Sequence, residues 1–529
     1  MAASQPLAAR AGVELLERGG NAVDAAIAAN AAIGLMEPTG NGIGGDLFAI
    51  VYEASTGKLY GLNASGWSPA GTSAELLKAR GETQMPQRGI HAVTVPGAVA
   101  GWDALRSRFG TKAFSELLAP AIYYAENGFP VSEIIAGHWA GAAKLLAAHP
   151  NSAQTFLPGG RTPSAGEVFR NPDLATSLRQ IARDGRDGFY KGSVATAMLQ
   201  ISDEQGGTLS AADLSEYQPE WVEPIQTTYR GWTVTELPPN GTGIAALMML
   251  NIMEQFPLGE WGVHSTKTMH TMIEAKKLAF ADLVRYIGDP RFSQLPVSEL
   301  LSRTHAQKQA QRIDPTRAAC NVEPSRLEGF TNSLGRDTIY LSVVDKDGNM
   351  VSLIQSNYAG FGSGLVPPGT GFMLHNRGGL FTLEDNHPNT LAPRKRPLHT
   401  IIPGFMEKDG VRIAFGIQGG FNQPQAHAQF VANIADHGMN VQQALESGRF
   451  TKKNFEGCDV DIEASVPEAT RQELTSLGHL LKVFPAWSTN FGNGQAVMSD
   501  RAGVHFGGSD PRNDGASIPQ MPPVFADGR

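Results

Sequence analysis

The stretch Asp337-Thr-Ile-Tyr-Leu-Ser-Val-Val-Asp-Lys-Asp-Gly-Asn349 marks a change in the pattern of the chain. From Thr338 onward apolar and polar residues alternate, which predicts a β-strand, and Lys-Asp-Gly is typical of a tight turn. Met350–Gln355 is then the expected returning strand. If the residues that flank the turn are paired, Ser356 lies opposite Thr338, whereas a slip of one residue would turn it to the other face.

Thr338 follows a polar, irregular segment over residues 303–336, which we interpret as a surface linker. A cut before such a residue exposes an N-terminal threonine, whose hydroxyl is a nucleophile and whose own α-amino group is a base. The amine suits that role because its unperturbed pKa is about 7.7–8.0. Taken alone, a threonine at the start of a strand equally reflects ordinary β-propensity.

The other segments predict a mixture of helices and strands. Two helices are expected within the first 36 residues, and Asn21 can cap the second. A hairpin is expected over Leu47–Leu62, and residues 98–330 are mostly helical in pattern. A further hairpin joins His399–Phe405 to Val411–Ile417.

Composition excludes several classes of protein. The chain has 529 residues with a formal charge of −8 and no basic run, which argues against nucleic-acid binding. With 41% hydrophobic and 18% charged residues it can bury a large core, and it has no apolar stretch long enough to span a membrane. A cytoplasmic location is the default, and a periplasmic one follows if a signal peptide was removed. Cys320 and Cys458 cannot build a disulfide framework but do not exclude a single bridge.

The chain lacks the short motifs of several common enzyme classes. No glycine pattern fits a dinucleotide or phosphate loop, and no His-Glu-x-x-His or Cys-x-x-Cys supports a zinc site. A Gly-x-Ser-x-Gly nucleophile elbow is also missing. The sequence therefore predicts neither a metal nor an organic cofactor.

Glycine-rich and proline-rich motifs occur in a characteristic order along nearly the whole chain. Together with the 337–349 stretch, they resemble the γ-glutamyltransferase family. That resemblance implies an α+β fold of the N-terminal nucleophile hydrolase type, an αββα four-layer sandwich built from both fragments of a self-cleaved precursor. The matching motifs are Gly19-Gly-Asn-Ala-Val-Asp-Ala-Ala26, Gly42-Ile-Gly-Gly-Asp46, Val95-Pro-Gly-Ala-Val-Ala-Gly101, Leu237-Pro-Pro-Asn-Gly-Thr-Gly243, Phe361-Gly-Ser-Gly364, Arg396-Pro397, Gln418-Gly-Gly420 and Ser509-Asp-Pro-Arg512.

The resemblance assigns the catalytic residues by position. Thr338 is the expected nucleophile, cleavage is expected between Asp337 and Thr338, and Ser356 is the expected assisting hydroxyl. Gly419 and Gly420 match the oxyanion hole, where glycine lets main-chain N–H groups approach a developing negative charge. A large fragment of residues 1–337 and a small one of 338–529 would form one intertwined unit, a heterodimer that could assemble further.

The positions that hold the glutamyl amino acid in this family are changed. In the family an arginine in this part of the chain holds the α-carboxylate. Here no arginine occurs from Ser65 until Arg80, and we expect Trp67 to fill the space instead. Tyr358 and Leu380 stand at the positions that bind the α-ammonium. His399-Thr400 replaces a tandem serine, and Arg377 replaces a glutamine.

These departures predict a substrate without an ammonium group. An ammonium beside Leu380 would lose its anionic partner, which costs several kcal/mol in a closed pocket. Arg377, His399, Thr400, Tyr358 and Trp67 are the predicted substrate-binding residues, although Arg377 could instead form a structural salt bridge. We expect an autoprocessed threonine amidohydrolase that cleaves a small anionic amide such as oxamate. The alternatives are a glutathione hydrolase or γ-glutamyltransferase, a cephalosporin-type acylase, and a non-catalytic binding protein.

Overall fold

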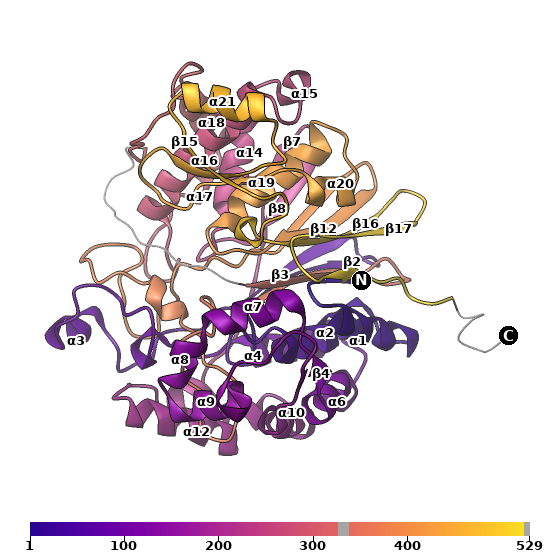
Figure 1. Cartoon of the computed structure of the whole chain (residues 1–529), viewed down its shortest axis with the longest axis vertical. Coiled ribbons are helices and arrows are strands. Elements are labelled where there is room, and N and C mark those ends of the chain that lie inside the picture. The colour runs from indigo at the N-terminus through magenta and orange to yellow at the C-terminus, as the bar shows by residue number, and fades with distance from the viewer. Residues whose placement is uncertain (326–337, 523–529) are drawn as a thin grey trace.

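Two β-sheets are stacked face to face between two layers of helices (Figure 1). This computed structural model describes residues 1–325 and 338–522. The seven-stranded sheet has the spatial order β18 (Ala516–Ser517), β1 (Ala2–Ala3), β9 (Ile339–Val344), β10 (Met350–Ser356), β2 (Asp46–Glu53), β3 (Lys58–Ala64), β6 (Glu220–Val222). The six-stranded sheet has the order β17 (His505–Ser509), β16 (Gly494–Ser499), β12 (Val411–Ile417), β11 (Gly404–Lys408), β8 (Trp232–Glu236), β7 (Ile225–Tyr229).

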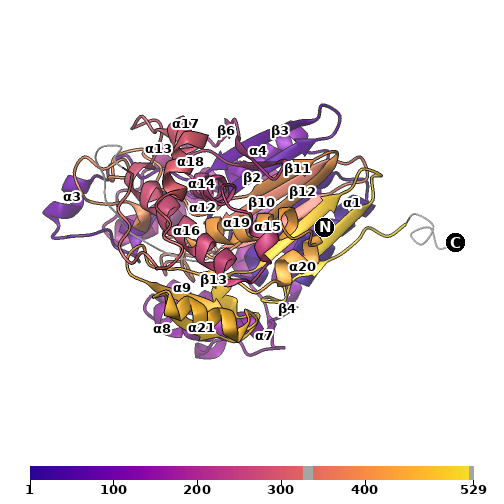
Figure 2. The same cartoon turned by 90° about the horizontal axis from the view of Figure 1, so that it is seen from above.

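Helices cover the outer face of each sheet. The seven-stranded sheet packs against α1 (Pro6–Glu17), α2 (Ala22–Met36) and α4 (Ala98–Phe109). On the other side of the molecule, α14 (Gly243–Met253), α16 (Thr266–Tyr286) and α19 (Asn422–Ala435) lie over the six-stranded sheet (Figure 2). Other long helices are α6 (Ala119–Asn127), α7 (Glu133–Gly141), α10 (Pro172–Asp184), α12 (Gly192–Glu204), α18 (Arg303–Ala310) and α21 (Glu468–Ser476).

Three hydrophobic clusters fill the spaces between the four layers. The cluster between the sheets includes Phe48, Tyr340 and Phe405, which come from β2, β9 and β11. Along β9, Leu341 points instead to the cluster beneath the α1 and α2 helices. Both faces of the central strands are therefore buried: every residue of β10 is buried, and so is every residue of β2 except the last.

The hairpin that opens on Thr338 has the predicted register. Ile339 pairs with Gln355 and Val344 pairs with Met350. One carboxylate oxygen of Asp345 accepts hydrogen bonds from the N–H groups of Asp347 and Asn349, both at 3.0 Å, and so closes the turn locally. The side chain of Asn21 caps α2, also as predicted.

Three expectations were wrong in detail. The segment described as mostly helical also contains the β7–β8 hairpin, and α18 occupies the start of the predicted linker. The strand expected from His399 begins only at Gly404, because the backbone of His399 is tied to another loop. Its N–H donates to the Asn240 carbonyl and its own carbonyl accepts from Thr242, both at 2.9 Å. Residues 326–336 of the predicted linker lie outside the described residues.

Segments on both sides of Thr338 build both sheets. In the seven-stranded sheet β9 and β10 lie between β1 and β2, and in the six-stranded sheet β11 pairs with β8. Neither half of the chain could therefore complete either sheet alone. Among the described residues, no helix combines the length and the apolar character needed to cross a bilayer.

Candidate active site

Thr338 lies immediately before β9, with its hydroxyl next to that of Ser356. The Thr338 hydroxyl donates to Ser356 Oγ at 3.2 Å. Ser356 ends β10 and accepts a second hydrogen bond from the Tyr358 N–H at 2.8 Å. The side chain of Thr338 lies on the same face of β9 as Tyr340, which points toward the six-stranded sheet. The pairing thus places both hydroxyls between the two sheets.

Gln423 contacts the Thr338 hydroxyl, and sequence reasoning missed it. Its Nε2 donates to Thr338 Oγ1 at 3.1 Å, and its Oε1 accepts from the Ile402 N–H at 3.1 Å. Because a backbone N–H can only donate, this second bond fixes which end of the carboxamide faces Thr338. Gln423 lies in the first turn of α19, three residues after Gly420. No motif marks it, and only its proximity to the glycine pair could have drawn attention to it.

Gly419 and Gly420 connect β12 to α19. Their φ angles are 126° and 60°, so both have left-handed backbone, which glycine adopts at little cost. Within the described residues, no group accepts a hydrogen bond from either N–H. Both amides stand just before the N-terminus of α19, where the helix dipole adds positive potential. The loop can therefore supply main-chain donors to a developing oxyanion.

A cavity of about 700 Å³ opens onto Thr338 and Gly419. Its lining combines apolar surface with polar side chains and carries few charged ones. One of these, Lys453, forms an ion pair with Asp461 at 2.7 Å. The remaining lining includes Ile135, His138, Phe361, Phe421, Asn422, Thr451, Asn454, Asn490 and Asn493. The cavity is large enough for an acyl group well beyond the size of oxamate.

Four of the five predicted substrate-binding residues meet in a fully buried cluster. Arg377 Nη1 donates to Thr400 Oγ1 at 2.7 Å, and its guanidinium lies 4.6 Å from the centre of the Tyr358 ring. Asp46 Oδ2 accepts from His399 Nε2 at 2.8 Å and lies 3.9 Å from Arg377 Nε. Asp46 also pairs with Ser356 across the sheet, so this cluster adjoins the Ser356–Thr338 hydroxyl pair.

Asp46 is the second functional candidate that sequence reasoning passed over. It belongs to the recognised Gly42–Asp46 motif, but its partners come from distant segments. Its other oxygen accepts from the Gly66 N–H at 2.9 Å, and His375 Nδ1 lies 3.7 Å from Oδ2. Burial alone would raise the pKa of Asp46, but His375, His399 and Arg377 outweigh burial and lower it to about 2.

The histidines of this cluster are neutral. Burial, followed by the charge of Arg377, lowers the pKa of His399 to about 3, and burial also lowers the pKa of His375. At neutral pH His399 therefore offers no positive charge to a substrate anion. Arg377 remains the cation: burial lowers its pKa only to about 10. Its Nε and Nη2 have no hydrogen-bond partner among the described residues.

Trp67 lies apart from this cluster. Its indole packs edge-on against Tyr217 at 5.3 Å, and Arg394 lies 5.0 Å from the ring. Its Nε1 donates to the Asp213 carbonyl at 3.4 Å. Tyr358 and Leu380, which stand where the family binds an ammonium group, both lie in the hydrophobic cluster beneath α14 and α16. Asp337, the other residue of the predicted cut, lies outside the described residues.

Comparisons with known proteins agree over nearly the full length. A family model described as gamma-glutamyltranspeptidase matches residues 8–520. A glutathione hydrolase-like proenzyme of Bacillus subtilis is 36% identical, covering 97% of this chain and 96% of that protein. An oxamate amidohydrolase proenzyme of Klebsiella pneumoniae is 34% identical, covering 97% and 96%.

A solved structure gives the same result for the fold. The crystal structure of a cephalosporin acylase from Bacillus halodurans is 43% identical and superposes with a TM-score of 0.91, covering 97% of this chain and 94% of that chain. The expected α+β fold of an N-terminal nucleophile hydrolase is thereby confirmed. The chain therefore belongs to the gamma-glutamyltranspeptidase family and is a hydrolase that acts on carbon–nitrogen bonds.

Proposed function

We propose that this enzyme hydrolyses an amide through an acyl ester on Thr338. The observation that supports this best is the placement of Thr338 Oγ1 between Ser356 and Gln423, on a cavity that Gly419 also lines. The contacts with Ser356 and Gln423 orient the Thr338 hydroxyl before a substrate arrives, so little reorganisation is needed at the moment of attack.

The proposed reaction uses only groups of the polypeptide. Thr338 Oγ1 attacks the amide carbonyl, and the α-amino group of Thr338 takes the hydroxyl proton. The carbonyl oxygen becomes negative and is stabilised by the N–H groups of Gly419 and Gly420. The carbon–nitrogen bond then breaks, and ammonia or an amine leaves with that proton. Water, deprotonated by the same amine, hydrolyses the ester and restores Thr338.

Maturation would create this amine. We propose that the Thr338 hydroxyl attacks the carbonyl of Asp337, that the acyl group moves from nitrogen to oxygen, and that water splits the ester. The products are a fragment of residues 1–337 and one of 338–529. Sequencing the small fragment should give Thr-Ile-Tyr. Any other first residue would exclude Thr338 as nucleophile, and Thr338→Ala should stay a single chain.

The proposed substrate carries a carboxylate and lacks an ammonium group. Arg377 is the charged group of the cluster with hydrogen-bonding capacity to spare, since its Nε and Nη2 have no hydrogen-bond partner among the described residues. Tyr358 and Leu380 offer no anion for an ammonium. Oxamate fits this chemistry, because its carboxylate adjoins the scissile amide and can accept two parallel hydrogen bonds from a guanidinium.

A bulkier acyl group is the second candidate. The cavity of about 700 Å³ and the 43% identity to a cephalosporin acylase both favour it. Arg377 is fully buried and is not part of the cavity lining, so an acyl group held in the cavity does not require contact with it.

One assay separates the candidates. The cleaved enzyme is given oxamate, a bulky N-acyl amide and a γ-glutamyl anilide, and the released amine or ammonia is measured. Fastest turnover of oxamate is the expected result. Fastest turnover of the bulky amide would favour the acylase, and fastest turnover of the anilide would restore the glutathione hydrolase alternative. A chain that never self-cleaves would favour the non-catalytic binding protein.

A further inference from the structure

The two cysteines lie on opposite sides of the proposed cut. Cys320 and Cys458 form a disulfide with a Cα–Cα distance of 4.5 Å, within the range that an unstrained backbone allows. Cys320 precedes Thr338 in the sequence and Cys458 follows it, at a sequence separation of 138. In an uncut chain this bond closes a loop, whereas after cleavage it joins two separate polypeptides. This step rests on the proposed maturation.

Backbone hydrogen bonds hold both sides of the bridge in place. The N–H of Ala318 donates to the carbonyl of Leu477 at 2.7 Å, directly across the proposed boundary between fragments. On the other side, the N–H of Leu480 donates to the carbonyl of Cys458 at 2.8 Å. Ala318 is two residues from Cys320, and Cys458 itself accepts the second bond. The backbone near each cysteine is thus held by a hydrogen bond.

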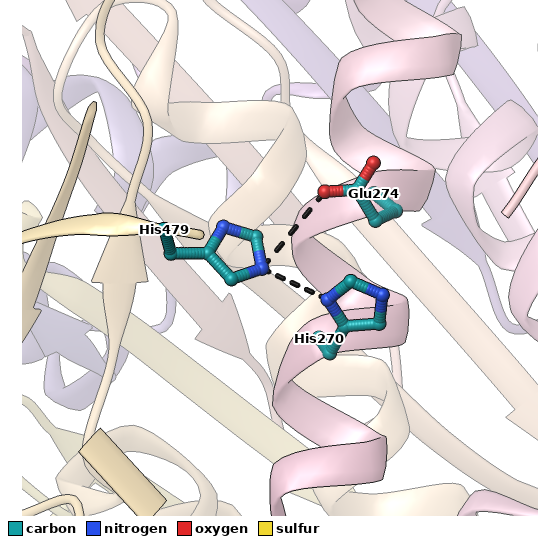
Figure 3. A group of neighbouring side chains, drawn as sticks. All are labelled: His270, Glu274 and His479. Carbon is teal, nitrogen blue, oxygen red and sulfur yellow. Dashed lines mark hydrogen bonds and ion pairs between the residues drawn. The ribbon is translucent and has the colours of Figure 1, made fainter. Parts of the chain in front are cut away.

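A buried polar cluster crosses the same boundary. His270 and Glu274 lie one turn apart on α16, and His479 faces them from the segment between α21 and β15 (Leu480–Phe484) (Figure 3). His270 Nδ1 and His479 Nε2 share a hydrogen bond of 2.8 Å. Glu274 Oε2 accepts from the N–H of Ala319, the neighbour of Cys320, at 3.2 Å.

Two histidines and a glutamate could in principle bind a metal ion. Hydrogen bonds and an ion pair to neighbouring groups, however, already account for their arrangement. The ammonium of Lys277 already lies 2.6 Å from Glu274 Oε1 and also donates to the Ala319 carbonyl at 2.8 Å. A cation placed at Glu274 would have to displace it. The cluster therefore acts as a hydrogen-bonded junction that orders the chain on both sides of the disulfide.

We propose that Cys320–Cys458 is a covalent bond between the two fragments of the mature enzyme. It fastens the large fragment at a point 17 residues before the proposed cut, so the new chain end stays attached to the small fragment. The shared sheets hold the folded fragments together without it. The bond matters when the fragments unfold or separate. It then keeps them at high local concentration and makes their reassembly intramolecular.

Formation of the bond requires an oxidising compartment. The two thiols give up two protons and two electrons to a protein or glutathione disulfide, which is reduced to two thiols. Such bonds persist outside the cytosol and are rare within it. The bridge thus favours the periplasmic location over the cytoplasmic default.

The test is a denaturing gel of the purified enzyme, run with and without reductant after free thiols have been blocked. Wild type should give one full-length band without reductant and two fragments with it. Cys458→Ser and Cys320→Ser should each give two fragments under both conditions, with unchanged turnover of the amide substrate. Two bands for unreduced wild type would overturn the inference.

Failure of cleavage can be told apart from failure of the bridge. If reduced wild type remains one band, the proposed maturation has failed. Thiol alkylation of the unreduced, denatured chain then reports the bridge by itself. A bridged chain takes up no label until it is reduced, while labelling of both cysteines would show that no bond exists. Uncut Thr338→Ala, carrying the same two cysteines, is the matched control.

Discussion

The two halves of the site differ in how they are built. The half around Thr338, Gly419 and Gly420 is made by backbone: a strand start, a hairpin register and a glycine loop. The half around Asp46 and Arg377 is made by side chains that converge from distant segments and are fully buried. The first half lies in segments that match the family motifs. In the second half Asp46 belongs to a matching motif, while Arg377 and His399 stand where the resemblance predicts other residues. Backbone geometry thus builds one half, whereas the other half depends on side chains that packing brings together.

The largest loss of activity that tests this contrast is expected from Gly420→Ala. Alanine keeps the main-chain N–H, but its Cβ disfavours the φ of 60° that aims this donor at the oxyanion. Taking one oxyanion donor out of position costs about 2.7–4 kcal/mol, or a factor of 10²–10³ in kcat. The added Cβ at a φ of 60° also costs about 1–2 kcal/mol of stability. Gly438→Ala is the matched control, because that glycine has a φ of 66° and open space around its would-be Cβ. Equal kcat in both variants would remove Gly420 from the mechanism.

Arg377→Lys tests whether the Arg377 guanidinium binds the substrate carboxylate. It keeps the buried charge beside Asp46 but removes the planar donor pair. Loss of the charge-assisted contact should weaken transition-state binding of oxamate by about 1.5–3 kcal/mol. The value of kcat/KM for oxamate should then fall roughly 10- to 150-fold. For an uncharged amide it should hardly change. Parallel losses on both substrates, measured by ammonia release, would assign Arg377 a structural role instead.

A smaller effect is expected from Gln423→Glu. The carboxylate can still accept from the Ile402 N–H, but it presents an acceptor to Thr338 Oγ1 in place of a donor. Loss of a neutral hydrogen bond of about 1 kcal/mol predicts a fall in kcat of about 5-fold, with KM little changed. The pH profile of kcat should also shift, since a charge now adjoins the nucleophile and its amine. An unchanged profile would contradict a positioning role for Gln423.

The weakest effect on activity concerns His399, whose contribution appears in stability. The folded state holds the pKa of His399 at about 3, below its usual value of about 6.5. Between these values only the unfolded chain binds the proton, so stability should fall as the pH drops from 6.5 toward 3. The urea midpoint should thus be lower at pH 4.5 than at pH 7. In His399→Gln this pH dependence should be weaker, and an equally steep curve would show that other groups cause it.

Local patterns predicted the parts of the fold that local forces decide. The register of the 338–356 hairpin follows from its turn and its alternation, and the start of α2 follows from Asn21. The β7–β8 hairpin was hidden in a segment with helical composition, because its strands are stabilised by pairing with β11 rather than by their own pattern.

Local sequence patterns are enough to place Thr338 at the start of its hairpin, to set Ser356 opposite it and to mark the glycine turn at 419–420. Packing of distant segments is what makes His399 neutral and brings Gln423 to Thr338. It also places Trp67 against Tyr217, away from the Arg377 cluster, and joins Cys320 to Cys458. The reason is the range of the forces involved. Turn geometry and strand alternation act over a few residues, whereas burial and charge depend on every segment that packs around a side chain.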